Sequence, residues 1–159
     1  MKKLPDVPLT PDLALKKAAR YCALQERSCK QMMQKLSDWG INKNTADDII
    51  VDLITNNFLN EERFAVAFAT GKFNTKRWGK RKIEYELKRH QISSANINTA
   101  LSSIDENTYL CTLKKLLTQR AQTVKANNPF EREQKLLNYA VQKGFEHTLI
   151  IETIKNIEQ

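Results

Sequence analysis

The side chains most able to do chemistry lie in one basic segment, residues 72–82, with the sequence KFNTKRWGKRK. This segment holds six basic side chains and no acidic one, and a tryptophan and a glycine lie in its middle. Ammonium and guanidinium groups spaced this closely favour a polyanion, because they form charge-assisted hydrogen bonds to phosphate or carboxylate. An indole among them can stack on a base or fill a partner's pocket. The segment therefore indicates a binding surface for an anionic partner.

Two interpretations of this segment that involve no binding partner stay open. A charge run is often only a solvated face, and Trp78 could pack under a bend as core instead of contacting a partner. Gly79 is a good entry to a helix, so Lys80, Arg81 and Lys82 are expected in its first turn, where the helix dipole disfavours cations. A sequence shaped only for stability would carry acidic residues in that turn. Their absence favours the anion-binding interpretation.

The candidate partner-binding or DNA-binding residues are this tryptophan, the six basic residues around it and two more on the same expected helix: Lys72, Lys76, Arg77, Trp78, Lys80, Arg81, Lys82, Lys88 and Arg89. The distribution of charge agrees with that choice. Of the net charge of +8, residues 59–104 contribute nine basic and four acidic side chains, a balance of +5. The middle third of the chain is therefore where a polyanion is expected to bind.

Motifs of catalysis and of cofactor binding are missing from the sequence. It has no phosphate-binding loop of the GxxxxGK[ST] type, no GxGxxG and no HExxH. The adjacent carboxylates Asp47 and Asp48, like Glu61 and Glu62, point about 100° apart on a helix and suit a helix start better than acid–base catalysis. We therefore expect a protein that is not an enzyme and that uses no cofactor.

The three cysteines, Cys22, Cys29 and Cys111, show no CxxC spacing. His90 and His147 lie in no spacing typical of metal ligands, so no metal site is expected. We expect all three cysteines to be buried, reduced thiols. No apolar run approaches the roughly 20 residues that span a bilayer, and the opening MKKLPDVPLTPDL lacks the apolar stretch of a secretory signal. The sequence thus predicts a cytoplasmic protein with no membrane association.

The chain should be helical throughout, because its apolar residues recur at intervals of three and four and it has only four glycines and four prolines. Residues with the side chains of helix N-caps are Thr10, Ser28, Asn44, Asn60 and Asn128. Ser28 and Gln31 form a capping-box pattern, and Gly40 should end a helix in the left-handed conformation. Two inner faces are expected, one of Ile49, Ile50, Leu53 and Ile54, the other of Leu110, Leu113, Leu117, Ala121 and Val124.

One sequence pattern occurs three times along the chain. The segment SCKQMMQKLSDWGI (28–41) aligns with GKRKIEYELKRHQI (79–92) at an offset of 51, and more loosely with REQKLLNYAVQKGF (132–145). Tandem helical units of this size tend to stack in a row. We therefore predict an all-α protein of three tandem three-helix repeats that form an elongated, curved array. The predicted bounds are a flexible N-terminal tail over 1–11 and repeats over 12–58, 59–104 and 105–159.

Residues 59–92, LNEERFAVAFATGKFNTKRWGKRKIEYELKRHQI, resemble the signature of the RecX family of bacterial regulatory proteins. The first block of that signature, (D/N)(D/E)ERFA, is matched by residues 60–65. Its second block is matched by Trp78, Gly79, Lys82, Ile83, Glu86, Leu87 and Ile92. The segment before it is similar to the family's preceding unit at Ser28, Leu36 and Gly40. One departure is Gln91, which stands where the family often has glycine, so the helix cap there must be made differently.

The resemblance implies an all-helical modulator, usually an inhibitor, of the RecA recombinase. Such proteins lodge in the groove of the RecA–DNA filament and impede ATP hydrolysis, strand exchange and filament growth, and so regulate recombinational DNA repair. The partners expected here are the RecA filament, its single-stranded DNA and, weakly, free DNA; we expect a monomer. The main alternative is a stand-alone helical nucleic-acid-binding protein that acts through the basic middle repeat. A second alternative is an adaptor whose basic surface meets only acidic protein.

Overall fold

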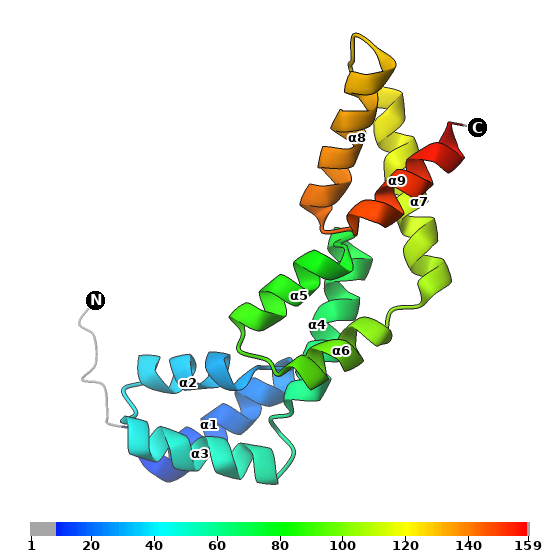
Figure 1. The fold of residues 1–159 in the computed structure, drawn as a ribbon. Coiled ribbons are helices and arrows are strands. Elements are labelled where there is room, and N and C mark those ends of the chain that lie inside the picture. Colours follow the sequence, from blue (N-terminus) through cyan, green and yellow to red (C-terminus); the bar gives the residue numbers. More distant parts are fainter. Residues whose placement is uncertain (1–8, 159) are drawn as a thin grey trace, which may run out of the picture. The chain divides into compact units, whose positions relative to one another are not determined.

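The computed structural model of the chain describes residues 9–158, which form nine α-helices and no strand (Figure 1). The helices are α1 (Pro11–Leu24), α2 (Cys29–Asp38), α3 (Lys43–Thr55), α4 (Glu61–Lys76), α5 (Lys80–Arg89), α6 (Ser94–Ser102), α7 (Glu106–Thr123), α8 (Pro129–Lys143) and α9 (His147–Ile157). The expected all-α class is confirmed. Most of the predicted tail, residues 1–8, lies outside the described residues.

The chain divides into two compact units. Among the described residues, unit 1 holds 9–64 together with His90–Ile92, and unit 2 holds Ala65–Arg89 and 93–158. The predicted repeat bounds and the curved array stay predictions.

The core of unit 1 lies among α1, α2 and α3. Its fully buried side chains are spaced three and four residues apart along each helix, as an amphipathic helix requires: Ala14, Ala18, Met32, Leu36, Ala46, Ile49 and Leu53. Both expected caps of the first two helices are present. The hydroxyl of Thr10 accepts a hydrogen bond from the N–H of Leu13, and Ser28 and Gln31 form the full capping box.

Two predictions about α3 are wrong in detail. The helix is capped by Asn42 and not by Asn44, because the side chain of Asn42 accepts a hydrogen bond of 2.9 Å from the N–H of Thr45. Ile49 and Leu53 are buried as expected, but Ile54 is 50 % exposed. It follows Leu53 by one residue, about 100° around the helix, and so leaves the apolar stripe.

Equivalent positions in the three copies of the repeated sequence pattern have equivalent environments. The first apolar position of each copy is buried, at Met32, Ile83 and Leu136, and so is the second, at Leu36, Leu87 and Ala140. The second-last residue of each copy has a positive φ: Gly40 (80°), Gln91 (60°) and Gly144 (99°). Gln91 therefore adopts the left-handed conformation that glycine adopts in the other two copies, which answers how the helix ends there.

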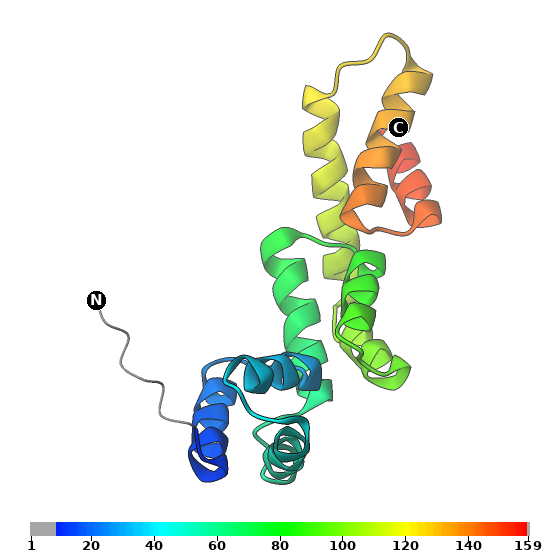
Figure 2. The ribbon, with the colours of Figure 1, turned by 90° about the vertical axis from the view of Figure 1, so that its left-hand side faces the viewer.

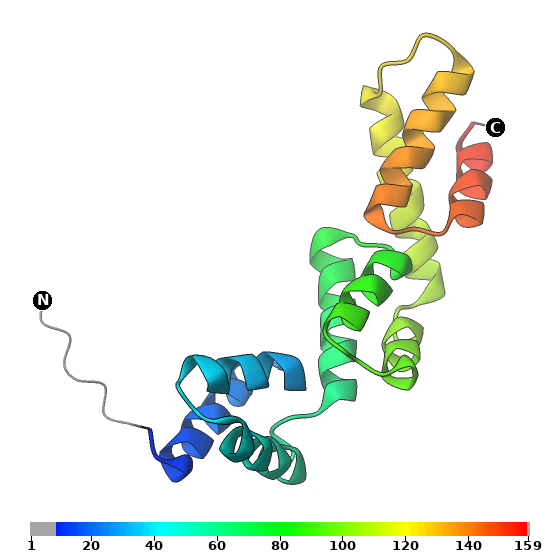
Figure 3. The ribbon, with the colours of Figure 1, turned by 60° about the vertical axis from the view of Figure 1, so that its left-hand side comes forward.

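In unit 2, α7 and α8 run antiparallel and are joined by residues 124–128 (Figure 2). The helix α9 packs against both of them (Figure 3). Asn128 caps α8 and Pro129 begins it, as expected. The inner face of α7 differs from the prediction: Tyr109, Leu113, Leu116 and Leu117 are buried, whereas Leu110 is 40 % exposed and Val124 follows the last helical residue.

The cysteines do not share one environment. Cys22 is buried and Cys29 is half-buried, but Cys111 is exposed on α7, so the expectation of three buried thiols is wrong for that residue. Burial raises the pKa of the Cys29 thiol to about 12, and a hydrogen bond to Glu61 adds to the effect. Within residues 9–158, no helix is long and apolar enough to cross a membrane.

Candidate partner-binding surface

The basic segment 72–82 occupies the end of α4, a short connection and the first turn of α5. The connection is Arg77–Trp78–Gly79, and the backbone of Arg77 is left-handed, with φ of 55°. For a residue with a Cβ this conformation costs roughly 1–2 kcal/mol, and glycine would adopt it without that cost. The backbone alone would favour glycine at this position, as it would at Gln91.

Trp78 is neither core nor freely exposed. Its half-buried ring meets the ring of Phe68 edge to face, with centroids 6.4 Å apart and planes at 66°. Two ammonium groups lie against the indole: Lys82 Nζ is 4.6 Å and Lys72 Nζ is 5.1 Å from its centroid. The ring of Trp78 thus packs on Phe68 and also lies against two cations, and its contact with a partner stays a prediction. We call Phe68, Lys72, Trp78 and Lys82 the Trp78 cluster.

Five of the candidate cations form no ion pair with any carboxylate of residues 9–158. They are Lys72, Lys76, Arg77, Arg81 and Lys82. Three of them, Lys76, Arg77 and Arg81, are exposed. An unneutralised group of this size attracts phosphate or carboxylate from solution, and most strongly at low salt. These five form what we call the open basic surface.

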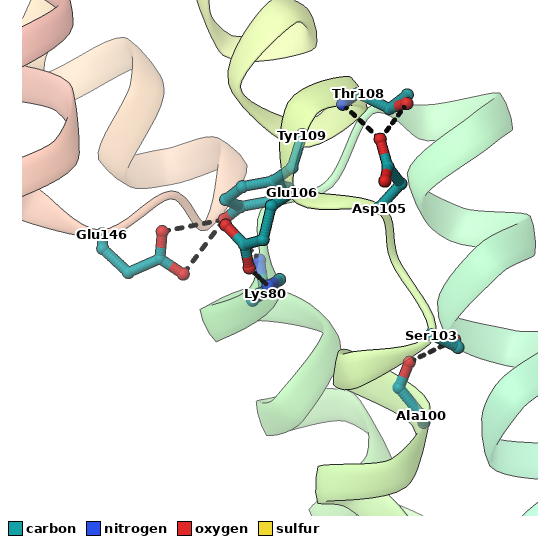
Figure 4. Close-up of polar contacts among 8 residues, drawn as sticks. All are labelled: Lys80, Ala100, Ser103, Asp105, Glu106, Thr108, Tyr109 and Glu146. Carbon is teal, nitrogen blue, oxygen red and sulfur yellow. Dashed lines mark hydrogen bonds and ion pairs between the residues drawn. The ribbon is translucent and has the colours of Figure 1, made fainter.

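Lys80 has a different role, because it is bound inside unit 2 (Figure 4). Its ammonium forms an ion pair of 2.6 Å with Glu106 and lies 4.9 Å from the ring centroid of Tyr109, and its side chain is 19 % exposed. Its backbone N–H donates a hydrogen bond of 3.0 Å to the Tyr109 hydroxyl, which in turn donates to the carboxylate of Glu146. Lys80 thus serves the packing of unit 2 and has little charge to offer a partner.

Tyr109 joins several elements of unit 2. It is 1 % exposed, and its ring packs between those of Phe73 and Phe145, at centroid distances of 5.8 and 5.1 Å. Burial raises the pKa of its hydroxyl well above the ordinary value, and the negative charge of Glu146 adds to this. The neutral hydroxyl can therefore accept from α5 and donate to Glu146 at once.

The three cations at the start of α5 are tolerated because α8 ends against that start. The N–H of Gly79 donates to the carbonyl of Lys143 (2.8 Å), and the N–H of Arg81 donates to the carbonyl of Gly144 (2.9 Å). The negative end of one helix dipole thus offsets the positive end of the other. The sequence alone reveals only the dipole of α5, because the contact with the end of α8 is tertiary.

Lys88 and Arg89 are exposed but, unlike the five cations above, each has a carboxylate partner. Lys88 forms an ion pair with Glu84 at 3.1 Å and Arg89 one with Glu86 at 3.4 Å, both within α5. Conversely, sequence reasoning missed Lys143, whose ammonium lies 3.4 Å from the carbonyl oxygen of Lys76 and adds a cation beside the basic segment. Only the tertiary fold brings Lys143 there.

Arg63, from the signature block, forms a structural ion pair in unit 1. Its guanidinium pairs with Glu26 at 2.5 Å and donates to the backbone carbonyls of Asn57 and Phe58. Glu61 of the same block accepts from the N–H of Cys29, at the first turn of α2. In this chain these two residues of the block hold unit 1 together.

Residues 9–158 thus form an all-α fold that carries five cations with no carboxylate partner. Among residues 9–158 there is also no group of three or more His, Cys, Asp or Glu side chains that could hold a metal ion. The comparison with protein families makes the class specific. Residues 14–53 match the first three-helix domain of RecX and residues 60–101 match the second, together just over half of the chain. The chain belongs to the RecX family.

Curated relatives agree with this assignment. Proteins named "Regulatory protein RecX" from Leuconostoc mesenteroides and Clostridioides difficile are 24 % and 26 % identical over 83 % and 86 % of this chain. The chain spans 49 % and 64 % of the length of those two relatives, and 87 % of the one from Chlorobium limicola, at 25 % identity. These names denote a regulator, which agrees with the expectation that the chain is not an enzyme.

Solved structures support the fold. The crystal structure of RecX from Lactobacillus salivarius superposes with a TM-score of 0.83 at 20 % identity, covering 93 % of this chain and 96 % of that one. A second crystal structure of a regulatory protein RecX gives 0.79 at 21 % identity, covering 92 % of this chain and 73 % of that one.

Proposed function

We propose that the chain binds the RecA–DNA filament in the cytoplasm and inhibits its ATPase, strand exchange and growth, thereby regulating recombinational repair. Membership of the RecX family supports RecA as the partner. The observation that carries the proposal is the open basic surface, whose five cations have no ion-pair partner among residues 9–158. A filament offers both DNA phosphate and protein carboxylate to such a surface.

Binding of this kind needs no catalysis by the regulator. The exposed guanidinium of Arg77 and the exposed ammonium of Lys76 can each form charge-assisted hydrogen bonds to phosphate or carboxylate. Each phosphate contact releases condensed counterions, which makes the interaction weaken as salt rises. Inhibition then follows if the bound chain blocks the movements or additions of subunits that the active filament needs.

The test is the DNA-dependent ATPase rate of the cognate RecA, with this protein titrated in at physiological salt. We expect the rate to fall at protein levels well below one chain per RecA subunit, as filament-directed regulation requires. An unchanged rate would overturn the proposal. Binding to DNA alone, measured in the same samples, would then favour the stand-alone nucleic-acid-binding alternative.

A further inference from the structure

A second group of cations and aromatic rings lies in unit 1, outside the open basic surface and the Trp78 cluster. The rings of Tyr21 and Trp39 meet edge to face, with centroids 6.2 Å apart and planes at 77°. Arg27 Cζ lies 3.8 Å and Lys35 Nζ 5.2 Å from the Tyr21 centroid, and Lys17 Nζ lies 4.3 Å from that of Trp39. We call these five residues the α1–α2 cluster.

Part of the α1–α2 cluster lies at positions that the repeat relates to the Trp78 cluster. At the offset of 51, Tyr21 corresponds to Lys72 and Arg27 corresponds to Trp78. In unit 1 the cation Arg27 stacks on the ring of Tyr21, and in unit 2 the cation Lys72 lies over the ring of Trp78. The same two positions thus pair a cation with a ring in both units, with the two residue types exchanged.

The net charge of the first predicted repeat does not reveal this concentration of positive charge. Residues 11–38, which include α1 and α2, carry six basic and three acidic side chains, whereas α3 carries Asp47, Asp48 and Asp52 against Lys43 alone. Among residues 9–158, none of Lys17, Arg27 and Lys35 forms an ion pair with a carboxylate. They lie against rings instead, and a ring leaves the full positive charge available to an anion.

We propose that the α1–α2 cluster is a second nucleic-acid contact, in which Lys17, Arg27 and Lys35 bind backbone phosphates of single-stranded DNA. Tyr21 and Trp39 are half-buried on the core of unit 1, so the rings are held in place before binding. Cations interleaved with aromatic rings suit a strand that offers both phosphates and base faces, whereas an acidic protein surface offers only charge. The inference rests on the proposed function only in taking DNA as the polyanion.

The test is binding of the full chain to fluorescein-labelled oligo-dT, without RecA, by anisotropy over a series of salt concentrations. The variant is Lys17→Glu with Lys35→Glu, which leaves Arg27 and both rings in place. Its matched control is Lys43→Glu with Lys114→Glu, two exposed lysines on α3 and α7 that change the net charge equally. Two lost phosphate contacts should make the slope of log K against log salt shallower by about 1.4, at roughly 0.7 per contact.

The inference is supported if the cluster variant loses that slope and the control keeps the wild-type slope. It is overturned if both behave alike, since net charge alone would then explain the effect, or if neither changes. Should the double variant melt below the wild type by circular dichroism, Arg27→Gln gives the same test with an expected loss of about 0.7. A variant that binds oligo-dT normally but no longer slows the RecA ATPase would assign the cluster to a protein partner and also overturn it. Failure of the proposed function would show instead as a wild type that leaves the ATPase unchanged.

Discussion

Gly79 and Gly144 touch through their backbones, at the point where α5 begins and α8 ends. A Cβ on Gly79 would lie 2.3 Å from the carbonyl carbon and oxygen of Gly144, and one on Gly144 would lie 2.3 Å from the Cβ of Lys82. Gly144 also has φ of 99°, which favours glycine independently of the space around it. The hydrogen bonds from Gly79 and Arg81 to the end of α8 depend on this close approach.

Gly79→Ala should therefore destabilise the protein, because the three atoms that the new Cβ would meet, two of Gly144 and the N of Phe145, are backbone and cannot rotate away. We expect a loss of about 1–3 kcal/mol in the free energy of unfolding by urea, in the range of overpacked sites. The control is Gly71→Ala inside α4, where a Cβ would meet nothing within 4 Å. That change should stabilise by about 0.5–1 kcal/mol. Equal effects of the two substitutions would contradict the close contact.

Tyr109→Phe should also destabilise, by roughly 1–3 kcal/mol, because it leaves the N–H of Lys80 and the carboxylate of Glu146 without the hydroxyl between them. The ring packing on Phe73 and Phe145 would remain. Tyr85→Phe is the control, since Tyr85 is 61 % exposed. Urea unfolding curves of the two variants should separate clearly, and a Tyr109→Phe protein as stable as the wild type would show that the hydroxyl is dispensable.

The raised pKa of Tyr109 predicts a dependence on alkaline pH. Unfolded tyrosine ionises near pH 10, whereas the buried hydroxyl in the folded chain resists ionisation. The contribution of this group to stability is thus fully present below about pH 10 and is lost as the pH rises toward the folded pKa. The difference in unfolding free energy between wild type and Tyr109→Phe should stay constant from about pH 8 to about pH 9.5 and narrow above about pH 10. A difference in unfolding free energy that stays constant over the whole pH range would contradict the raised pKa of Tyr109.

The substitution Arg77→Gly distinguishes the effect of the strained backbone on stability from the effect of the side chain on partner binding. Glycine relieves the left-handed conformation but is more flexible when unfolded, so stability should stay within about 1 kcal/mol of the wild type. Regulation of the RecA ATPase should nevertheless weaken, because an exposed guanidinium is lost. Gln91→Gly, at φ of 60°, is the control for backbone relief and should leave regulation unchanged. If the Arg77→Gly protein inhibits the RecA ATPase as fully as the wild type, the Arg77 side chain is not part of the partner-binding surface.

Much of the fold was predictable because it depends on local sequence. Caps such as Ser28 and Asn60 and the apolar stripe through Met32 and Leu36 are set by neighbours three and four residues away. The cap of α3 was misplaced by two residues because Asn42 and Asn44 both have suitable side chains, and only the backbone conformation distinguishes them.

The candidate surface was only partly predictable. Its location follows from charge, but the engagement of Lys80 with Glu106 and Tyr109 depends on α7, which lies far along the chain. The α1–α2 cluster left no signal in charge counts, because the acidic side chains of α3 offset it in the sum. Which cations are available to a partner is a tertiary property, and it became visible only in the folded chain.

The most direct test of the account is co-sedimentation of the chain with RecA filaments assembled on single-stranded DNA, at physiological salt. The variant reverses the three exposed cations of the open basic surface, Lys76, Arg77 and Arg81, to glutamate. The control reverses Lys43, Lys114 and Lys115, which are exposed on α3 and α7. We predict that the wild type and the control pellet with the filament and that the variant stays in solution with an unchanged melting temperature. A variant that pellets as the wild type does, or a wild type that stays in solution, would contradict the account.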